Sequence, residues 1–363
     1  MPETPTVQLL DESGVRTPSP EWDRWIEDLD DATLADRYED MVVLRRIDAE
    51  ATALQRQGEI ALWPPVLGQE AAQIGSGRAL RADDFVFGSY RETGVAYTRG
   101  IDPVAIARVW RGAAASAWNP YDVGMATSQV IIGAQALHAT GYAMGIQADR
   151  LLDPDVADSV AVAYFGDGAM SEGDVSEAMI FAATYQAPVI FFCQNNQFAI
   201  SEPVTLQSTV PLADRPAGFG IPSVRVDGND VLAVTAVMRE ALDRARSGGG
   251  PSFIEAVTYR MGPHTTADDP TRYRDPEELE VWGRRDPILR LRTLLEQRGV
   301  FGPELETRVA ATADRVAAEL RAGVKAMTDP DPITVFDHAY AEPHVELDRQ
   351  RDEYARYLEG FAQ

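Results

Sequence analysis

Polar residues that could bind a phosphorylated, metal-bound ligand follow two apolar segments in the middle of the chain. Gly166-Asp167-Gly168 follows the run Val160–Phe165, and Asn195-Asn196 follows the run Ala187–Cys193. Glycines let backbone N–H groups come close to an anion, and the N-terminus of a following helix adds a favourable dipole. The aspartate and the asparagines offer hard oxygen ligands, which a backbone carbonyl and diphosphate oxygens would complete into an octahedral magnesium shell.

The segments around these residues predict how they are positioned. Short runs that are apolar at every position are typical of parallel strands buried on both faces. Between the two runs, an apolar stripe recurs at helical spacing, and it consists of Val175, Ala178, Met179, Ala182 and Ala183. The pattern predicts a βαβ unit, with the polar residues at the carboxyl edge of the sheet, where open α/β sheets bind ligands. Taken alone, Gly166–Gly168 is equally typical of a tight turn with a solvated aspartate.

Two further segments carry residues suited to the same ligand. Tyr90 and Arg91 lie in the segment Phe85–Gly94, and a guanidinium fork matches a pair of diphosphate oxygens. His264 lies in the loop that follows the predicted strand Ser252–Tyr259, so it can reach the same edge of the sheet. By themselves, a surface salt bridge and a solvated histidine would explain these residues as well.

The longer motifs resemble a known family. GDG, then 26 residues from Ala169 to Gln194, then NN looks like the thiamine diphosphate motif, and GDGAMSEGD with PVIFFCQNNQFAIS resembles the α subunit of the decarboxylating component of 2-oxo acid dehydrogenase complexes. The resemblance runs from about residue 31 to about residue 340. It implies the thiamine diphosphate-binding α/β fold, a parallel sheet flanked by helices, for the main domain at 31–330. The polar and acidic ends of the chain predict an irregular arm at 1–30 and a helical arm at 331–363.

The resemblance also implies roles for individual residues. Magnesium would be held by Asp167, Asn196 and the main-chain carbonyl of Phe198. Thiamine diphosphate would meet the other candidates, with the aminopyrimidine ring near the backbone around Ile132 and the phosphates near Tyr90, Arg91, Gly166, Gly168, Ala169 and His264. His264 would be catalytic, acting in acyl transfer.

The same resemblance implies partners. A β subunit would supply the glutamate that activates the cofactor, in an assembly of two α and two β chains, and a lipoyl-bearing acyltransferase core would receive the acyl group. Pro64 replaces a histidine of pyruvate-type relatives, and DDPTRYR and FAIS favour the branched-chain type. Pro263, Thr265 and Gln194 depart from the pattern of some relatives. Pyruvate or acetoin dehydrogenase α subunits, and a non-catalytic scaffold subunit, remain alternatives. A nicotinamide-binding dehydrogenase is disfavoured because GxGxxG is missing.

Composition narrows the class of protein. A net charge of −24, from 57 acidic and 33 basic residues, argues against nucleic acid or anionic membranes as partners. The single cysteine, Cys193, excludes internal disulfides, and the single lysine, Lys325, disfavours a P-loop or a Schiff-base enzyme. Without an apolar run of about 18 residues, no membrane helix is expected. A soluble, cytoplasmic protein is therefore expected, and the resemblance implies that it is an oxidoreductase subunit.

Overall fold

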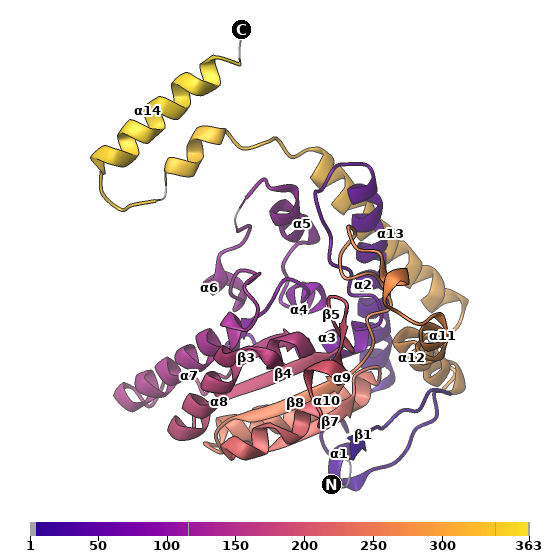
Figure 1. Cartoon of the computed structure of the whole chain (residues 1–363). Helices are drawn as coiled ribbons and strands as arrows, with labels where there is room; N and C mark the ends of the chain where they lie inside the picture. Colours follow the sequence, from indigo (N-terminus) through magenta and orange to yellow (C-terminus); the bar gives the residue numbers. More distant parts are fainter. Residues whose placement is uncertain (1–4, 115, 338, 362–363) are drawn as a thin grey trace.

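A six-stranded parallel sheet lies at the centre of the molecule (Figure 1). The computed structural model describes residues 5–114, 116–337 and 339–361. The strand order is β1-β7-β8-β4-β3-β2, and every neighbouring pair is parallel. The strands are β1 (Thr6–Val7), β2 (Phe85–Phe87), β3 (Ala161–Gly166), β4 (Val189–Asn195), β7 (Ser223–Asp227) and β8 (Ser252–Val257). The predicted α/β fold is confirmed, and the two central runs form adjacent strands, β3 and β4.

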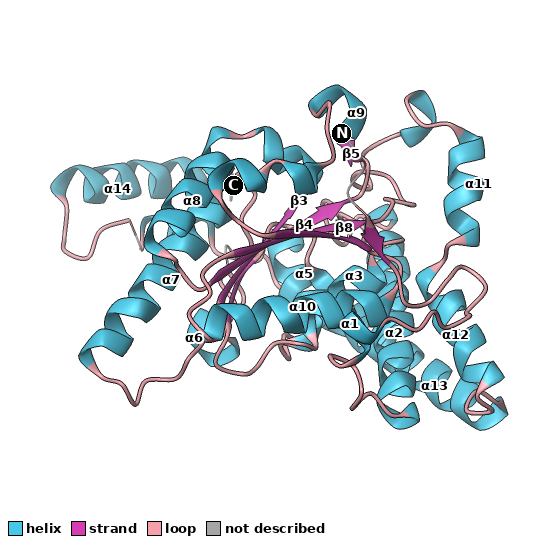
Figure 2. Ribbon diagram, turned by 90° about the horizontal axis from the view of Figure 1, so that it is seen from below, coloured by secondary structure: helices cyan, strands magenta, loops and turns pink. Residues whose placement is uncertain are grey.

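Helices cover both faces of this sheet (Figure 2). Alternate residues of a strand point to opposite faces, so Ala161, Ala163 and Phe165 of β3 pack with one set of helices, and Val162 and Tyr164 pack with the other. The first set is α7 (Ala134–Leu152) and α8 (Gly173–Tyr185). The second set includes α2 (Asp31–Arg56), α3 (Glu70–Gly77) and α10 (Val231–Arg246). Burial on both faces explains why these strands are apolar throughout.

The remaining elements surround this core. The other α-helices are α1 (Pro20–Asp23), α4 (Thr93–Thr98), α5 (Pro103–Arg111), α6 (Pro120–Val123), α9 (Val204–Gln207), α11 (Pro276–Arg284), α12 (Pro287–Gln297), α13 (Pro303–Lys325) and α14 (Val345–Glu359). A two-stranded antiparallel ribbon joins β5 (Phe198–Ala199) to β6 (Glu202–Pro203). The 3-10 turns are η1 (Asp167–Ser171), η2 (Leu212–Asp214), η3 (Pro216–Phe219), η4 (Pro270–Arg272) and η5 (Pro332–Phe336). None of the helices in the described residues is long and apolar enough to cross a membrane.

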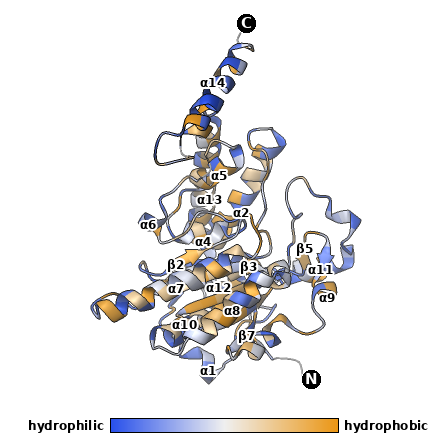
Figure 3. Ribbon diagram, turned by 60° about the vertical axis from the view of Figure 1, so that its left-hand side comes forward, coloured by the Kyte–Doolittle hydropathy of each residue, from blue (hydrophilic) through white to orange (hydrophobic). Residues whose placement is uncertain are grey.

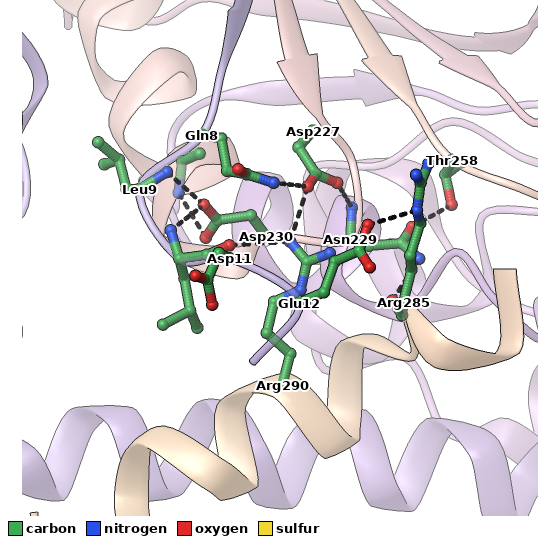
Figure 4. Close-up of polar contacts among 12 residues, drawn as sticks. Gln8, Leu9, Asp11, Glu12, Asp227, Asn229, Asp230, Thr258, Arg285 and Arg290 are labelled. Carbon is green, nitrogen blue, oxygen red and sulfur yellow. Dashed lines mark hydrogen bonds and ion pairs between the residues drawn. The ribbon is translucent and has the colours of Figure 1, made fainter. Parts of the chain in front are cut away.

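The N-terminal arm is more ordered than the expected irregular segment. Its strand β1 pairs with β7 at the edge of the sheet, and Leu9 and Leu10 are fully buried. Figure 4 shows how Asp230 holds this arm: its carboxylate accepts hydrogen bonds from the backbone N–H groups of Leu9 and Leu10, both at 2.6 Å. A two-residue strand carries no periodicity that a sequence could reveal, and its stability comes from contacts with distant residues.

The C-terminal arm stands apart from the body in Figure 1. Its helix α14 has no buried residue and contacts mainly η5. The hydropathy colouring of Figure 3 shows that this helix is mostly hydrophilic. No described residue of this arm lines the cavity treated below, whose residues all come from the main body.

Candidate active site

A cavity of about 260 Å³ opens at the carboxyl ends of β3 and β4. The structure brings all the predicted site residues to its wall: Tyr90, Arg91, Ile132, Gly166, Asp167, Gly168, Ala169, Asn196, Phe198 and His264. They come from five separate stretches of the chain, which the parallel sheet gathers at one edge. The roles inferred for them stay predictions, because the wall shows where they lie and not what they bind.

Asp167 is the most distinctive group in this cavity. Its side chain is 1% exposed, and burial raises the pKa of the carboxyl to about 6. Gln207 donates a hydrogen bond to Oδ2 at 3.1 Å, whereas Oδ1 is buried and has no hydrogen-bond partner. A buried carboxylate oxygen without a donor is costly, so it is suited to a cation. No cluster of three or more His, Cys, Asp or Glu able to hold a metal lies within the described residues, and a cation beside Asp167 would need neutral or external oxygens.

The neutral oxygens predicted as ligands lie next to Asp167. Asn196 accepts a hydrogen bond from the Phe198 N–H at 3.3 Å, and its amide nitrogen donates to Gln69 at 3.2 Å. The carbonyl of Phe198 already accepts a hydrogen bond from Arg260 Nη1 at 3.0 Å. Since a carbonyl oxygen has two lone pairs, a cation ligated by Phe198 would share that oxygen with Arg260.

The glycine-rich turn differs from the expected strand-to-helix junction. The residues after β3 form the 3-10 turn η1, and α8 begins only at Gly173. The N-terminus of α8 therefore does not directly follow the GDG motif. A Cβ atom at Gly168 would lie 2.8 Å from the Cβ of Ala199, so the close approach of η1 to the β5 strand requires glycine at this position.

Arg91 is buried and fixed by backbone carbonyls. Its Nη1 donates to the carbonyl of Pro65 at 2.8 Å, and its Nη2 donates to the carbonyl of His264 at 2.9 Å. Within the described part of the chain, Arg91 forms no ion pair with a carboxylate. Its positive charge therefore remains available to an anion in the cavity.

His264 is neutral at pH 7, and its surroundings select one tautomer. Burial and the charges of Arg91 and Arg260 lower the pKa of this imidazole to about 4. Its Nδ1 lies 3.2 Å from Arg91 Nη2 and 3.4 Å from Arg260 Nη1. Because a guanidinium can only donate, Nδ1 must accept, and the ring proton is assigned to Nε2. His264 is thus set up as a hydrogen-bond donor through Nε2.

The loop carrying His264 is held by its own hydrogen bonds. Asp268 accepts from the backbone N–H of His264 at 2.8 Å and from the hydroxyl of Tyr273. Arg260 donates to the same hydroxyl at 3.0 Å, and Arg274 donates to the carbonyl of Gly262 at 2.9 Å. The histidine is therefore fixed in position before any ligand binds, which limits the ordering that binding requires.

Sequence reasoning missed several residues of the wall, including Gln69, Glu92 and Glu172, and Gln135 also lines it. Gln69 and Gln135 are fully buried, and Gln69 Nε2 and Gln135 Oε1 have no hydrogen-bond partner. Two unpartnered polar atoms in a cavity wall indicate a polar ligand. A single glutamine beside a helix, such as Gln69, carries no motif that could have identified it from the sequence.

Glu70 and Gln194, two polar residues close to the cavity, have hydrogen-bond partners within the chain. Glu70 accepts hydrogen bonds from Arg45 at 2.8 Å and from the Gly68 N–H at 2.9 Å, and it does not line the cavity. Gln194 donates to Glu92 at 2.8 Å and accepts from Gln73 at 2.9 Å. Burial raises the pKa of the Glu92 carboxyl. Gln194 thus lines the cavity but is held in a buried hydrogen-bond network with Glu92 and Gln73.

Comparisons with known proteins agree with the geometry of this site. The family described as "Dehydrogenase E1 component" matches residues 38–332. Over 348 residues, 96% of this chain and 92% of the relative, the chain is 50% identical to "3-methyl-2-oxobutanoate dehydrogenase subunit alpha" of Mycobacterium tuberculosis strain H37Rv. It is 38% identical to "Pyruvate dehydrogenase E1 component subunit alpha" of Acholeplasma laidlawii, over 90% of this chain and 94% of the relative. It is also 38% identical to "Pyruvate dehydrogenase E1 component subunit alpha" of Staphylococcus aureus strain Mu50, over 91% of this chain and 86% of the relative.

The resemblance inferred from the sequence is confirmed by these matches. They extend over nearly the whole chain and include the glycine-rich turn, the Arg91 segment and the His264 loop. The chain belongs to the dehydrogenase E1 component family, the thiamine diphosphate-dependent decarboxylating components of 2-oxo acid dehydrogenases, and is similar to α subunits of the branched-chain type.

Proposed function

We propose that this chain is the α subunit of a branched-chain 2-oxo acid dehydrogenase, which oxidatively decarboxylates a 2-oxo acid and passes the acyl group to a lipoyl arm. The substrate class is inferred from sequence identity. The chain is 50% identical to a relative named for 3-methyl-2-oxobutanoate and 38% identical to relatives named for pyruvate. Pro64, in place of the histidine of pyruvate-type relatives, supports the same choice.

The residues of the cavity fit thiamine diphosphate and magnesium. The unpartnered Oδ1 of Asp167 suits a magnesium ion, with Asn196 and the Phe198 carbonyl as further oxygen ligands and diphosphate oxygens in the remaining positions. Backbone N–H groups of Gly168 and Ala169 and the charge of Arg91 suit the diphosphate, together with Tyr90, Gly166 and His264 at the same wall. Ile132 would contact the aminopyrimidine ring.

The chemistry is divided between the cofactor and the protein. When bound, thiamine diphosphate supplies a carbanion-stabilising ring that acts as an electron sink. The neutral His264 donates a hydrogen bond from Nε2 to the reacting oxygen or to a phosphate oxygen. Arg91 and Arg260 keep that imidazole neutral and oriented.

The partners follow from the subunit class. An α subunit of an E1 component implies a β subunit and a complex with an acyltransferase. We infer an assembly of two α and two β chains, in which the β subunit supplies the glutamate that activates the cofactor. The isolated α chain is then expected to be inactive, and a lipoyl-bearing acyltransferase core is the acyl acceptor.

The test uses the α chain co-expressed with its β subunit. Calorimetric titration of thiamine diphosphate with Mg²⁺ should give saturable binding, and an artificial electron acceptor should report turnover. We expect kcat/KM for 3-methyl-2-oxobutanoate to exceed that for pyruvate by about tenfold or more, the range that one or two methyl groups in an apolar pocket provide. A reversed preference would assign the pair to the pyruvate type. Absence of binding to the intact pair would indicate a scaffold subunit and overturn the proposal.

A further inference from the structure

Asp48 is a buried aspartate that does not line the cavity. It is hydrogen-bonded to a short segment that in turn contacts Arg91 and the His264 loop. Asp48 lies on α2 and is 5% exposed. Its Oδ1 accepts a hydrogen bond from Trp63 Nε1 at 2.9 Å, and its Oδ2 accepts from the backbone N–H groups of Leu67, at 2.9 Å, and Val66. Three donors from the segment Trp63–Leu67 therefore converge on one carboxylate of a long helix.

The same segment is hydrogen-bonded to the Arg91 side chain. Pro65, in the middle of the segment, accepts from Arg91 Nη1 at 2.8 Å. Proline has no N–H group, so the carbonyl is the hydrogen-bonding group that its backbone can offer. The position of Arg91 in the cavity is thus coupled to the position of this short segment.

The segment also flanks the His264 loop on both sides. The Met261 N–H donates to the carbonyl of Leu67 at 3.0 Å, on one side of His264. On the other side, Thr266 and Trp63 exchange two hydrogen bonds, from the Thr266 N–H at 2.9 Å and from the Trp63 N–H at 3.0 Å. The loop therefore forms backbone contacts with the segment before and after its histidine.

We propose that Asp48 is a positioning residue that fixes both Arg91 and His264 by anchoring the segment Trp63–Leu67 to α2. The inference rests on the proposed function, since its consequence is the binding of thiamine diphosphate. Asp48 itself does not line the cavity. It acts on the site through the carbonyl of Pro65 and through the backbone contacts of Trp63 and Leu67.

The carboxylate is required because all its partners are donors. An asparagine has nearly the same shape, but its amide nitrogen would face a donor, either Trp63 Nε1 or the N–H groups of Val66 and Leu67. A donor facing a buried donor leaves both unsatisfied. Asp48→Asn should therefore release one end of the segment without creating a cavity.

The chain offers a matched control on the same helix. Asp40 is also buried on α2, at 6% exposure, but its side chain accepts two hydrogen bonds of 2.8 Å from Arg78 and none from the segment Trp63–Leu67. Asp40→Asn therefore perturbs a buried aspartate of α2 equally and leaves the cavity wall in place.

The experiment compares Asp48→Asn and Asp40→Asn in the co-expressed α–β pair. Calorimetry with thiamine diphosphate and Mg²⁺ should show affinity lowered about tenfold in Asp48→Asn and unchanged in Asp40→Asn, a range typical of residues that orient ligand-binding groups. Combining Asp48→Asn with Arg91→Met should weaken binding by less than the product of the two single effects, because both act on one contact.

Several outcomes separate this inference from the proposed function. Binding by the wild-type pair, with equal affinity in Asp48→Asn and Asp40→Asn, would overturn the positioning role alone. No binding by the wild-type pair would overturn the proposed function, and the positioning role with it. If Asp48→Asn fails to fold, Trp63→Phe removes one of the three donors and keeps an aromatic, although smaller, side chain at this buried position. An affinity loss of about threefold would then support the inference, and wild-type affinity would contradict it.

Discussion

Two buried aspartates at the same edge of the sheet are used in opposite ways. Asp167 follows β3 and Asp230 follows β7, both are almost fully buried, and burial raises the pKa of each carboxyl to about 6. Asp230 accepts four backbone hydrogen bonds, from Leu9 and Leu10 at 2.6 Å each, and from the first turn of α10 at 2.9 and 3.1 Å (Figure 4). Asp167 has a single side-chain donor, and its second oxygen has none.

The difference shows which observation points to a ligand. A raised pKa reports burial, and it is shared by a carboxylate that caps a helix and one that faces a cavity. The unpartnered oxygen of Asp167 distinguishes the two residues. Burying a carboxylate oxygen without a hydrogen-bond donor costs free energy, and a bound cation would offset that cost. Asp230 accepts hydrogen bonds at both of its carboxylate oxygens and therefore stabilises the fold. Asp167 has one carboxylate oxygen free to bind a ligand in the cavity.

The largest effect is expected from removing the open carboxylate. Asp167→Ala should lower the Mg²⁺-dependent affinity for thiamine diphosphate about 100-fold or more, since even outer partners of a metal ligand contribute 10–100-fold. The melting temperature should stay the same or rise, because a buried and poorly compensated carboxylate is lost. Calorimetry and thermal unfolding of the α–β pair measure both quantities. Unchanged affinity would remove Asp167 from the metal site and end the distinction between the two aspartates.

Asp230→Ala should instead destabilise the fold. The substitution leaves the N–H groups of Leu9 and Leu10 without an acceptor and removes the N-cap of α10, which together cost about 2–4 kcal/mol. Denaturant unfolding measures the loss, and the folded fraction should still bind the cofactor normally. Asp243→Ala, at an exposed position of the same helix, is the control and should change stability by less than about 0.5 kcal/mol. A loss of affinity in folded Asp230→Ala would show that the two regions are coupled.

The free energy of unfolding should depend on pH because the Asp230 carboxyl is buried. The folded-state pKa is about 6 and the ordinary value is 3.8, so between these values the native state holds a proton that the unfolded state has released. Stability contributed by this group is therefore present at low pH and is lost as pH rises through about 6, at up to about 1.4 kcal/mol per pH unit.

The measurement compares wild type with Asp230→Asn. The variant does not titrate at this position, so its free energy of unfolding minus that of wild type should increase between about pH 4 and pH 6 and then level off. A constant difference over this range would mean that Asp230 titrates at the same pH in both states.

The smallest effect is expected from Gln207→Ala. This change removes the donor to Asp167 Oδ2 and leaves the proposed ligand oxygens in place, so the affinity for cofactor and Mg²⁺ should fall about tenfold or less. Thr205→Ala, at an exposed position of the same short helix α9, should leave the affinity unchanged. A loss as large as that of Asp167→Ala would make Gln207 a part of the metal site.

Much of this architecture could be predicted from local patterns. The apolar runs that became β3 and β4 and the stripe of α8 were evident because burial on both faces of a sheet removes polar residues from its strands. The short strand β1 and the 3-10 turn at Asp167 were not predicted, since neither has a length or a period that differs from a loop.

The sequence by itself determined where the polar site residues would gather, because the carboxyl ends of parallel strands share one edge and the motifs follow those strands. Only the tertiary structure decided which polar atoms stay unpartnered. Two of the four donors to Asp230 come from residues 221 and 220 positions away. The side-chain donor to Asp167 Oδ2 comes from 40 positions away, and Oδ1 of Asp167 receives none. Hydrogen bonds between distant segments follow from packing, and no local spacing encodes them.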